Sequence, residues 1–563
     1  MSNSNSENRV MLNRREVLLL AAAGGIGAAL ARPAMASDSI KTAVHQEPGN
    51  CSTPQSAITN TKYGKVRGFL DGGVFTFKGV PYGQNTAGEN RWLPAKEPKP
   101  WTGEYPALIY GANCMQRPHD WTGIEQVFIQ DWDDGYISED MLKLNIWTPS
   151  LTGKLPVMFY IHGGGFEFGS AYELPSHEGA QMARHHDVVQ ISVNHRLNAL
   201  GFLDVSEIGG PDYADSVNVG MTDLVAALRW VRDNVANFGG DPNNVMIYGQ
   251  SGGGGKVATL LGMPSAAGLF HRAAIQSGGG GASPLDEAKE FSRQLVKQLG
   301  IAPNDIGALQ KLDWSALMVA SDAAQAKMPK RSGPFASMPG PPRRFWGPTL
   351  DGRVITVRSF QDGAPEISKN VPMMIGSVSD EGNAMASRPT EAEWRAGLAR
   401  AYGEAKGNTL ADAMKKAHPE KSIRTLSYMC GGAGILNALS IRNSVVSMAK
   451  QKYELHAAPV YTYYFSWQSP MLEDAGAWHT ADLQFCFDNT KRCEQGTGNT
   501  PEAQVLAKKM ATAWANFART GNPSQPGLTW EPTDPETNKT MVWDNNCRMV
   551  NDPEGELRKI LLS

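Results

Sequence analysis

The sequence predicts an α/β fold with a mostly parallel central sheet that is covered by helices on both faces. Short apolar, partly β-branched runs bounded by turn residues alternate with helical patterns along the chain. This alternation is typical of a parallel sheet. No internal repeat and no long linker divides the 563 residues. We therefore expect one large folded unit, although the length alone would allow three or four domains.

The predicted elements begin with short strands and turns over residues 61–79. Buried strands are expected at 144–147, 157–161, 188–193, 245–248, 273–276, 371–375 and 460–467. Helices are expected at 222–235 and 256–261, and largely helical segments at 285–328 and 390–450. The helix at 222–235 is the clearest, because its apolar residues recur at intervals of three or four. Residues 334–348 are rich in Pro and Gly and predict a loop.

Composition narrows the possible partners and cofactors. The formal charge is −3, and no run of Lys and Arg could neutralise a phosphate backbone, so nucleic acid is not an expected partner. No CxxC motif or His/Cys cluster has the spacing of metal ligands, and we expect no metal or other cofactor. Six cysteines are too few to form the main scaffold of so long a chain. A disulfide between Cys486 and Cys493 is left open.

Residues 1–36 are predicted to be a signal peptide of the twin-arginine type. Arg14 and Arg15 precede an apolar run over residues 17–30, and Ala34-Met35-Ala36 offers small residues to a signal peptidase. The alternative is a membrane anchor, but a run of about 14 residues is shorter than the ~20 that span a bilayer. We expect an exported protein, periplasmic or secreted, without stable membrane insertion once the signal is removed.

The nucleophile is predicted from Gly249-Gln250-Ser251-Gly252-Gly253, which follows an expected strand and precedes an expected helix. A serine in a sharp strand-to-helix turn presents its hydroxyl, and the flanking glycines leave room for that turn. The pattern alone is common in a chain with 59 glycines. Its position between strand and helix therefore carries the prediction that Ser251 is a nucleophile.

A second glycine motif, His162-Gly163-Gly164-Gly165-Phe166, directly follows the strand expected at 157–161. Consecutive glycines let the backbone aim two amide groups at one point, as a tetrahedral oxyanion requires. The alternative is a simple glycine-rich turn. We predict an oxyanion hole formed by the amides of Gly164, Gly165 and Gly252.

At this point the chain resembles the type-B carboxylesterases, the cholinesterase-like branch of the α/β hydrolases, over nearly all of residues 37–563. Further motifs that carry the resemblance are Phe77-Lys78-Gly79-Val80-Pro81, Ser138-Glu139-Asp140, Asn194-His195-Arg196-Leu197, Gln276-Ser277-Gly278 and Trp514-Ala515-Asn516-Phe517. The resemblance implies a single α/β-hydrolase domain over 37–563, in which helical insertions shape the substrate pocket.

The resemblance also implies the other two members of a catalytic triad, which follow in the order Ser, acid, His in esterases of this fold. The strand at 371–375 leads into Asp380-Glu381-Gly382, where Glu381 matches the acid and Asp380 is the alternative. His479 matches the family's histidine loop and is the expected base. His418 and His456 are the other candidates, and both are expected to be solvated.

These residues predict a serine carboxylesterase that hydrolyses a small-molecule ester through an acyl-enzyme intermediate. The same triad serves amide, carbamate and lactone hydrolases, which remain the nearer alternative. A more remote alternative is a non-catalytic, cholinesterase-like binding protein. The residues do not predict an oligomeric state.

The chain departs from the family pattern at two places. Gln250 stands where the family usually has Glu, which makes a cationic, choline-like substrate less expected. Met141 stands where the family has a Cys that pairs with the position of Cys114, so that disulfide cannot form. Two ion pairs implied by the resemblance, Arg91 with Glu139 and Arg196 with Asp223, are expected to be structural.

Overall fold

The computed structural model describes residues 53, 55–118, 124–328, 346–382, 388–430 and 437–563. The predicted signal peptide and most of the predicted loop at 334–348 lie outside these residues. All of the described residues belong to one compact unit, Gly49–Ser563.

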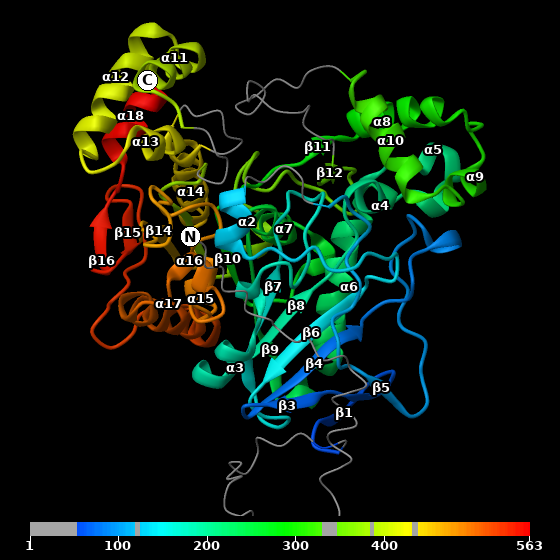
Figure 1. The fold of residues 1–563 in the computed structure, drawn as a ribbon. Helices are drawn as coiled ribbons and strands as arrows, with labels where there is room; N and C mark the ends of the chain where they lie inside the picture. Colours follow the sequence, from blue (N-terminus) through cyan, green and yellow to red (C-terminus); the bar gives the residue numbers. More distant parts are fainter. Residues whose placement is uncertain (1–52, 54, 119–123, 329–345, 383–387, 431–436) are drawn as a thin grey trace, which may run out of the picture. The chain divides into compact units, whose positions relative to one another are not determined.

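The unit is built on an 11-stranded sheet with the strand order β16-β15-β14-β13-β10-β9-β7-β8-β6-β4-β3 (Figure 1). The strands from β8 to β15 in this order run parallel, and the pairs at both edges are antiparallel. The strands are β3 (Phe69–Asp71), β4 (Val74–Pro81), β6 (Lys143–Thr148), β7 (Leu155–Ile161), β8 (Val189–Val193), β9 (Gly240–Gln250), β10 (Arg272–Gln276), β13 (Met373–Val378), β14 (Val460–Phe465), β15 (Lys539–Trp543) and β16 (Arg548–Asn551). The prediction of a mostly parallel sheet is confirmed.

Two small sheets and a set of helices complete the unit. The small sheets contain β1 (Ile58–Thr61), β2 (Gly64–Arg67) and β5 (Glu104–Pro106), and β11 (Ser283–Pro284) with β12 (Thr349–Leu350). The helices are α2 (Ile124–Gln130), α3 (Ala180–His186), α4 (Asn198–Phe202), α5 (Ser206–Gly209), α6 (Val219–Asn234), α7 (Gly252–Leu261), α8 (Leu285–Leu299), α9 (Ile306–Gln310), α10 (Trp314–Gln325), α11 (Glu391–Tyr402), α12 (Glu404–Ala417), α13 (Ile423–Met429), α14 (Ala438–Tyr453), α15 (Leu483–Cys486), α16 (Glu494–Thr497), α17 (Pro501–Thr520) and α18 (Gly555–Leu562).

The two faces of the sheet build two separate cores, because side chains alternate along each strand. In β7, Phe159 packs with residues of α6 and α14, whereas Tyr160 packs with residues of α3 and α17. In β9, Ile247 belongs to the same core as Phe159, and Tyr248 belongs to the same core as Tyr160. Helices therefore cover both faces, as the alternation of strand and helix signals predicts.

The parallel strands bring their carboxyl ends to one edge of the sheet, where ligands bind in open α/β sheets. β7 ends at Ile161, just before the glycine motif, and β9 ends at Gln250, just before Ser251. β13 ends at Val378, three residues before Glu381. The topology thus collects the predicted site residues at this edge.

The two expected ion pairs are confirmed. Arg196 donates from Nε to Asp223 Oδ2 at 2.8 Å, and the pair is almost completely buried. Arg91 donates from Nε to Glu139 Oε2 at 2.8 Å and also reaches a backbone carbonyl. Each pair ties a loop to the sheet or to the insertion, which is a structural role.

The possible disulfide between Cys486 and Cys493 is not formed, because both are buried free thiols. Cys114 is also free, as expected from Met141, and its sulfur accepts a hydrogen bond from the amide of Leu197 at 3.2 Å. Within the described part of the chain, no cluster of His, Cys, Asp and Glu is arranged to hold a metal ion. In the same residues we find no helix with the length and apolar character needed to cross a membrane.

Candidate active site

Ser251 occupies a strained turn between β9 and α7. Its backbone has φ 59° and ψ −125°, a conformation that residues other than glycine rarely adopt. The amide of Ser251 donates to the carbonyl of Gln276 at 2.8 Å, which fixes the turn to the end of β10. The turn therefore has the geometry of a nucleophile elbow, with Ser251 immediately before the amino end of a helix.

The glycine motif after β7 lies against this elbow. A Cβ built on Gly252 would lie 2.4 Å from the amide nitrogen of Gly165, so the two backbones are in direct contact. Gly164 and Gly165 have φ 81° and 61°, which an L residue would adopt only with strain. Among the described residues, the amides of Gly164, Gly165 and Gly252 have no hydrogen-bond acceptor. Three unpaired donors therefore lie beside Ser251, as an oxyanion hole requires.

Glu381 and His479 form a direct pair. The Nδ1 atom of His479 lies 2.5 Å from Glu381 Oε2, and the carboxylate is completely buried. The other carboxylate oxygen, Oε1, accepts from the amide of Val378 at 3.2 Å. Because both oxygens have partners, the carboxylate is fixed in an orientation that holds the imidazole.

His479 lies next to the elbow as well. The amide nitrogen Nε2 of Gln250 is 3.3 Å from Nδ1 and 3.2 Å from Nε2 of His479. The hydroxyl of Ser251 makes no hydrogen bond within the described residues. Bonds between nucleophile and base are often long before substrate binds and tighten in the complex. The structure thus brings together all six residues that the sequence predicts for the site.

Asp380 has different partners from Glu381. Its carboxylate is buried, accepts from Lys421 Nζ at 2.6 Å and from the amide of Ala477 at 2.9 Å, and so ties the end of β13 to the histidine loop. Burial opposes ionisation, but the Lys421 ammonium and the neighbouring donors outweigh it and lower the pKa of Asp380. Asp380 therefore holds the two loops together, and among the described residues it makes no hydrogen bond or ion pair with His479.

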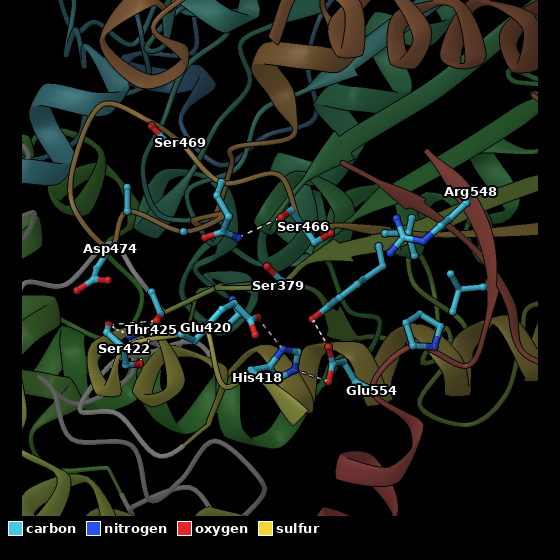
Figure 2. Close-up of a pocket in the computed structure, with 18 residues that line it drawn as sticks. Ser379, His418, Glu420, Ser422, Thr425, Ser466, Ser469, Asp474, Arg548 and Glu554 are labelled. Atoms are coloured by element: carbon cyan, nitrogen blue, oxygen red, sulfur yellow. Dashed lines mark hydrogen bonds and ion pairs between the residues drawn. The ribbon is translucent and has the colours of Figure 1, made fainter. Parts of the chain in front are cut away.

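A polar pocket of about 490 Å³ lies beside the Asp380–Lys421 pair (Figure 2). Ser379 and Gly476 from the two loops line it together with Lys421, whereas Ser251, Glu381 and His479 do not. His418 points to Glu420 and Glu554 in Figure 2, at 3.4 and 3.0 Å. Hydrogen bonding to Glu554 overcomes the effect of burial and raises the pKa of His418.

The other two histidine candidates are thus excluded as partners of Glu381. The expectation that His418 is solvated is wrong, because its side chain is only 18% exposed and is held between two carboxylates. The same expectation is confirmed for His456, which is exposed and whose ring lies against Tyr453. In the described residues, neither histidine makes a hydrogen bond or an ion pair with Glu381.

The sequence does not predict that Gln130 contacts the histidine loop. Gln130, at the end of α2, donates from Nε2 to Thr480 Oγ1 at 2.8 Å and to the carbonyl of His479 at 3.4 Å. Thr480 has φ 86°, a strained value that such contacts help to maintain. No local motif around Gln130 indicates this contact, because the two residues are 350 positions apart.

Comparison with known proteins agrees with this geometry. The model of the carboxylesterase family matches residues 55–557. The chain belongs to the carboxylesterase family. It is 32% identical over 507 residues to the para-nitrobenzyl esterase of Bacillus subtilis (strain 168). The aligned region covers 90% of this chain and 98% of that protein.

Other carboxylesterase relatives cover similar lengths. The phenmedipham hydrolase of Pseudarthrobacter oxydans is 32% identical over 493 residues, or 84% of this chain and 92% of that protein. A solved esterase from Clostridium hathewayi, described as able to hydrolyse aliphatic aromatic polyesters, is 32% identical with a TM-score of 0.77. It covers 91% of this chain and 99% of its own. These likenesses establish an ester hydrolase of the α/β-hydrolase fold.

Proposed function

We propose that this carboxylesterase acts through Ser251 as the nucleophile, His479 as the base and Glu381 as the acid. The observation that carries the proposal is the pair of the buried Glu381 carboxylate with the partly exposed His479, beside a strained serine. The amides of Gly164, Gly165 and Gly252, which have no acceptor in the part of the chain that the structure describes, lie by the same serine and would bind an oxyanion.

The reaction follows from these positions. His479 takes the proton of the Ser251 hydroxyl as its oxygen attacks the ester carbonyl, and Glu381 stabilises the imidazolium that forms. The oxyanion of the tetrahedral intermediate accepts hydrogen bonds from the three amides, each typically worth about 2.7–4 kcal/mol of barrier. His479 returns the proton to the leaving alcohol, and water then releases the acid from the acyl-enzyme.

Replacement of Ser251 tests the proposal. We expect Ser251→Ala to keep the wild-type circular dichroism spectrum and to lose turnover of p-nitrophenyl acetate by a factor of about 10⁴ or more. Turnover within tenfold of the wild type would remove Ser251 from the mechanism. A matched panel then measures which bond is preferred: an ester, an anilide with the same acyl group, and a carbamate with the same alcohol as the ester. Faster cleavage of the anilide or carbamate would favour the alternative hydrolase.

We further propose that the protein is exported after removal of residues 1–36. The support is the order of Arg14-Arg15, the apolar run at 17–30 and Ala34-Met35-Ala36. Amino-terminal sequencing of the protein from the native host's exported fraction is expected to begin at Ser37. A chain that retains Met1 and stays with the cytoplasmic fraction would overturn this proposal without affecting the esterase assignment.

A further inference from the structure

A completely buried lysine lies in the helix that follows Ser251. Lys256, in α7, has no exposed surface. Its Nζ donates to the carbonyl of His162 at 3.0 Å and to the carbonyl of Gly163 at 3.2 Å. The ring of Phe166 lies 5.5 Å from the same nitrogen. One side chain of the nucleophile helix therefore holds the segment that carries the proposed oxyanion glycines.

The ammonium of Lys256 is held by carbonyl dipoles instead of a counter-ion. Among the described residues, no carboxylate lies within ion-pair distance of it. Burial lowers the pKa of Lys256 to about 7. Glu173 is the acid that faces it, and burial raises the pKa of Glu173 well above its usual value. Burying an amine costs free energy that an apolar side chain of similar length would not cost. Packing alone therefore does not explain a lysine at this position.

The groups around Lys256 are themselves uncharged. Burial lowers the pKa of His162 and of His195 well below the usual value, so both rings are neutral near pH 7. Their centroids are 4.8 Å apart, and neither nitrogen of His195 has a hydrogen-bond partner in the described residues. In the described residues, the carbonyls of His162 and Gly163 are thus the hydrogen-bond acceptors of Lys256.

The first turn of α7 explains why a long side chain is needed here. A Cβ built on Gly253 would lie 2.0 Å from the carbonyl oxygen of Ile161, so glycine backbone packs directly against the end of β7. Gly252 makes the same close approach to Gly165. Because residues 252–255 are all glycine, they offer no side-chain donor to the segment at 162–165. Lys256 is the first residue of the helix that can supply one.

The geometry of the peptide unit connects this contact to the oxyanion hole. In a planar trans peptide the C=O and the N–H point in opposite directions. The Gly163 carbonyl and the Gly164 amide belong to one peptide unit. A hydrogen bond that holds this carbonyl toward Lys256 therefore turns the amide of Gly164 away from the helix interior.

We propose that Lys256 is a positioning residue of the oxyanion hole, which holds the carbonyl of Gly163 so that the amide of Gly164 faces the ester carbonyl at Ser251. The inference rests on the proposed function, since it concerns the same intermediate. Lys256 acts through the backbone and does not contact substrate.

The test compares Lys256→Met, which keeps the length but loses the donors, with Lys256→Gln, which keeps a neutral donor. Lys452 provides a matched control. It is also buried and donates to two carbonyls, those of Ser368 and Lys369 at 2.5 and 3.1 Å. These carbonyls precede the amino end of β13, whereas Ser251 lies at the carboxyl ends of the parallel strands.

We expect Lys256→Met to lower kcat for p-nitrophenyl acetate about 10- to 100-fold with KM changed less than threefold, because a misplaced donor weakens only transition-state binding. Lys256→Gln should recover part of that loss. Lys452→Met should keep kcat within threefold. Affinity for a trifluoromethyl ketone, which forms a tetrahedral adduct with an active serine, should fall in Lys256→Met by the same factor as kcat/KM.

Equal kcat values for Lys256→Met and Lys452→Met would overturn the positioning role, as would a loss of kcat without loss of ketone affinity. If Lys256→Met does not fold, the ketone affinity and kcat of Lys256→Gln decide by the same criteria. A wild-type protein without esterase turnover and without ketone binding would instead refute the proposed function itself. The two failures are therefore distinguishable.

Discussion

Two regions meet at the carboxyl edge of the sheet, and they are held in place by different means. The nucleophile region, residues 161–166 with 250–256, is packed backbone against backbone, as the close approach of Gly252 to Gly165 shows. The acid region, residues 378–382 with 476–480, is held by side chains, above all by Asp380 and Lys421. The first depends on glycines that leave room for this contact, with Lys256 as its one side-chain donor, and the second depends on a charged side-chain pair. Substitutions should therefore damage the two regions in different ways.

The largest effect in the acid region is expected from Glu381→Gln. The amide keeps the shape but loses the charge that stabilises the imidazolium of His479, so kcat should fall by about 10³- to 10⁴-fold. Steady-state kinetics with p-nitrophenyl acetate measures it. Asp380→Asn is the control at the neighbouring acid, and its kcat in the folded fraction should stay within about tenfold of the wild type. A larger loss in Asp380→Asn than in Glu381→Gln would reverse the assignment of the acid.

The next largest effect is expected from Lys421→Met, which leaves the buried carboxylate of Asp380 without its counter-ion. Removal of one partner of a buried pair typically costs about 3–5 kcal/mol. Urea unfolding measures the loss. Lys415→Met is the control, because its pair with Glu391 is exposed and such pairs contribute about 0–1 kcal/mol. Equal losses in both variants would show that Asp380 does not depend on Lys421.

The same pair predicts a pH dependence. Because the folded protein lowers the pKa of Asp380, the carboxylate contributes stability that is fully present above its unfolded pKa of about 3.9 and is lost as pH falls through the folded value. Without Lys421, we expect burial to outweigh the remaining donors and to raise the pKa of Asp380 instead. The free energy of unfolding of Lys421→Met, relative to the wild type, should therefore recover as pH falls from 7 toward 4. A difference that stays constant over this range would contradict the account.

A smaller effect on stability is expected in the nucleophile region from Gly253→Ala. The added methyl would lie 2.0 Å from the carbonyl oxygen of Ile161, and overpacking of this kind costs about 1–3 kcal/mol. The higher helix propensity of Ala offsets about 1 kcal/mol of it. Gly255→Ala is the control, since its nearest contact is 3.2 Å, and it should cost less stability than Gly253→Ala. Thermal unfolding of both variants measures the difference, and equal shifts in Tm would argue against direct backbone contact.

The contrast between the regions also explains what could be predicted from the sequence. Backbone contact requires glycine, and glycines at 163–165 and around Ser251 are visible as motifs. The apolar run at 157–161 predicts β7 to within two residues, because continuous apolar runs mark buried strands. The run at 245–248 predicts only the later part of β9, which begins at Gly240 in a polar stretch. The hairpin of β15 and β16 and the helix α17 were not predicted as elements from local patterns. Their pairing and packing partners, β14 and the sheet face, lie far along the chain.

The side-chain contacts that hold the site in place could not be predicted from the sequence. Lys421 and Asp380 are 41 positions apart, and Gln130 and Thr480 are 350 apart. The sequence indicates Asp380 only as an alternative acid, since its burial and its partner come from tertiary structure. Lys256 begins a helix in the sequence, where a lysine is usually solvated. Only the packing of α7 against β7 shows that it is buried.

The covalent labelling of Ser251 tests the central claim most directly. Wild-type protein and Ser251→Ala are incubated with a diethyl phosphate triester, followed by intact-mass measurement, peptide mapping and an esterase assay of the same samples. We predict one diethylphosphoryl group per wild-type chain, located on Ser251, with activity lost in proportion to labelling, and none on Ser251→Ala. A label on another residue that accompanies the loss of activity, or full inhibition without any label, would contradict the serine mechanism.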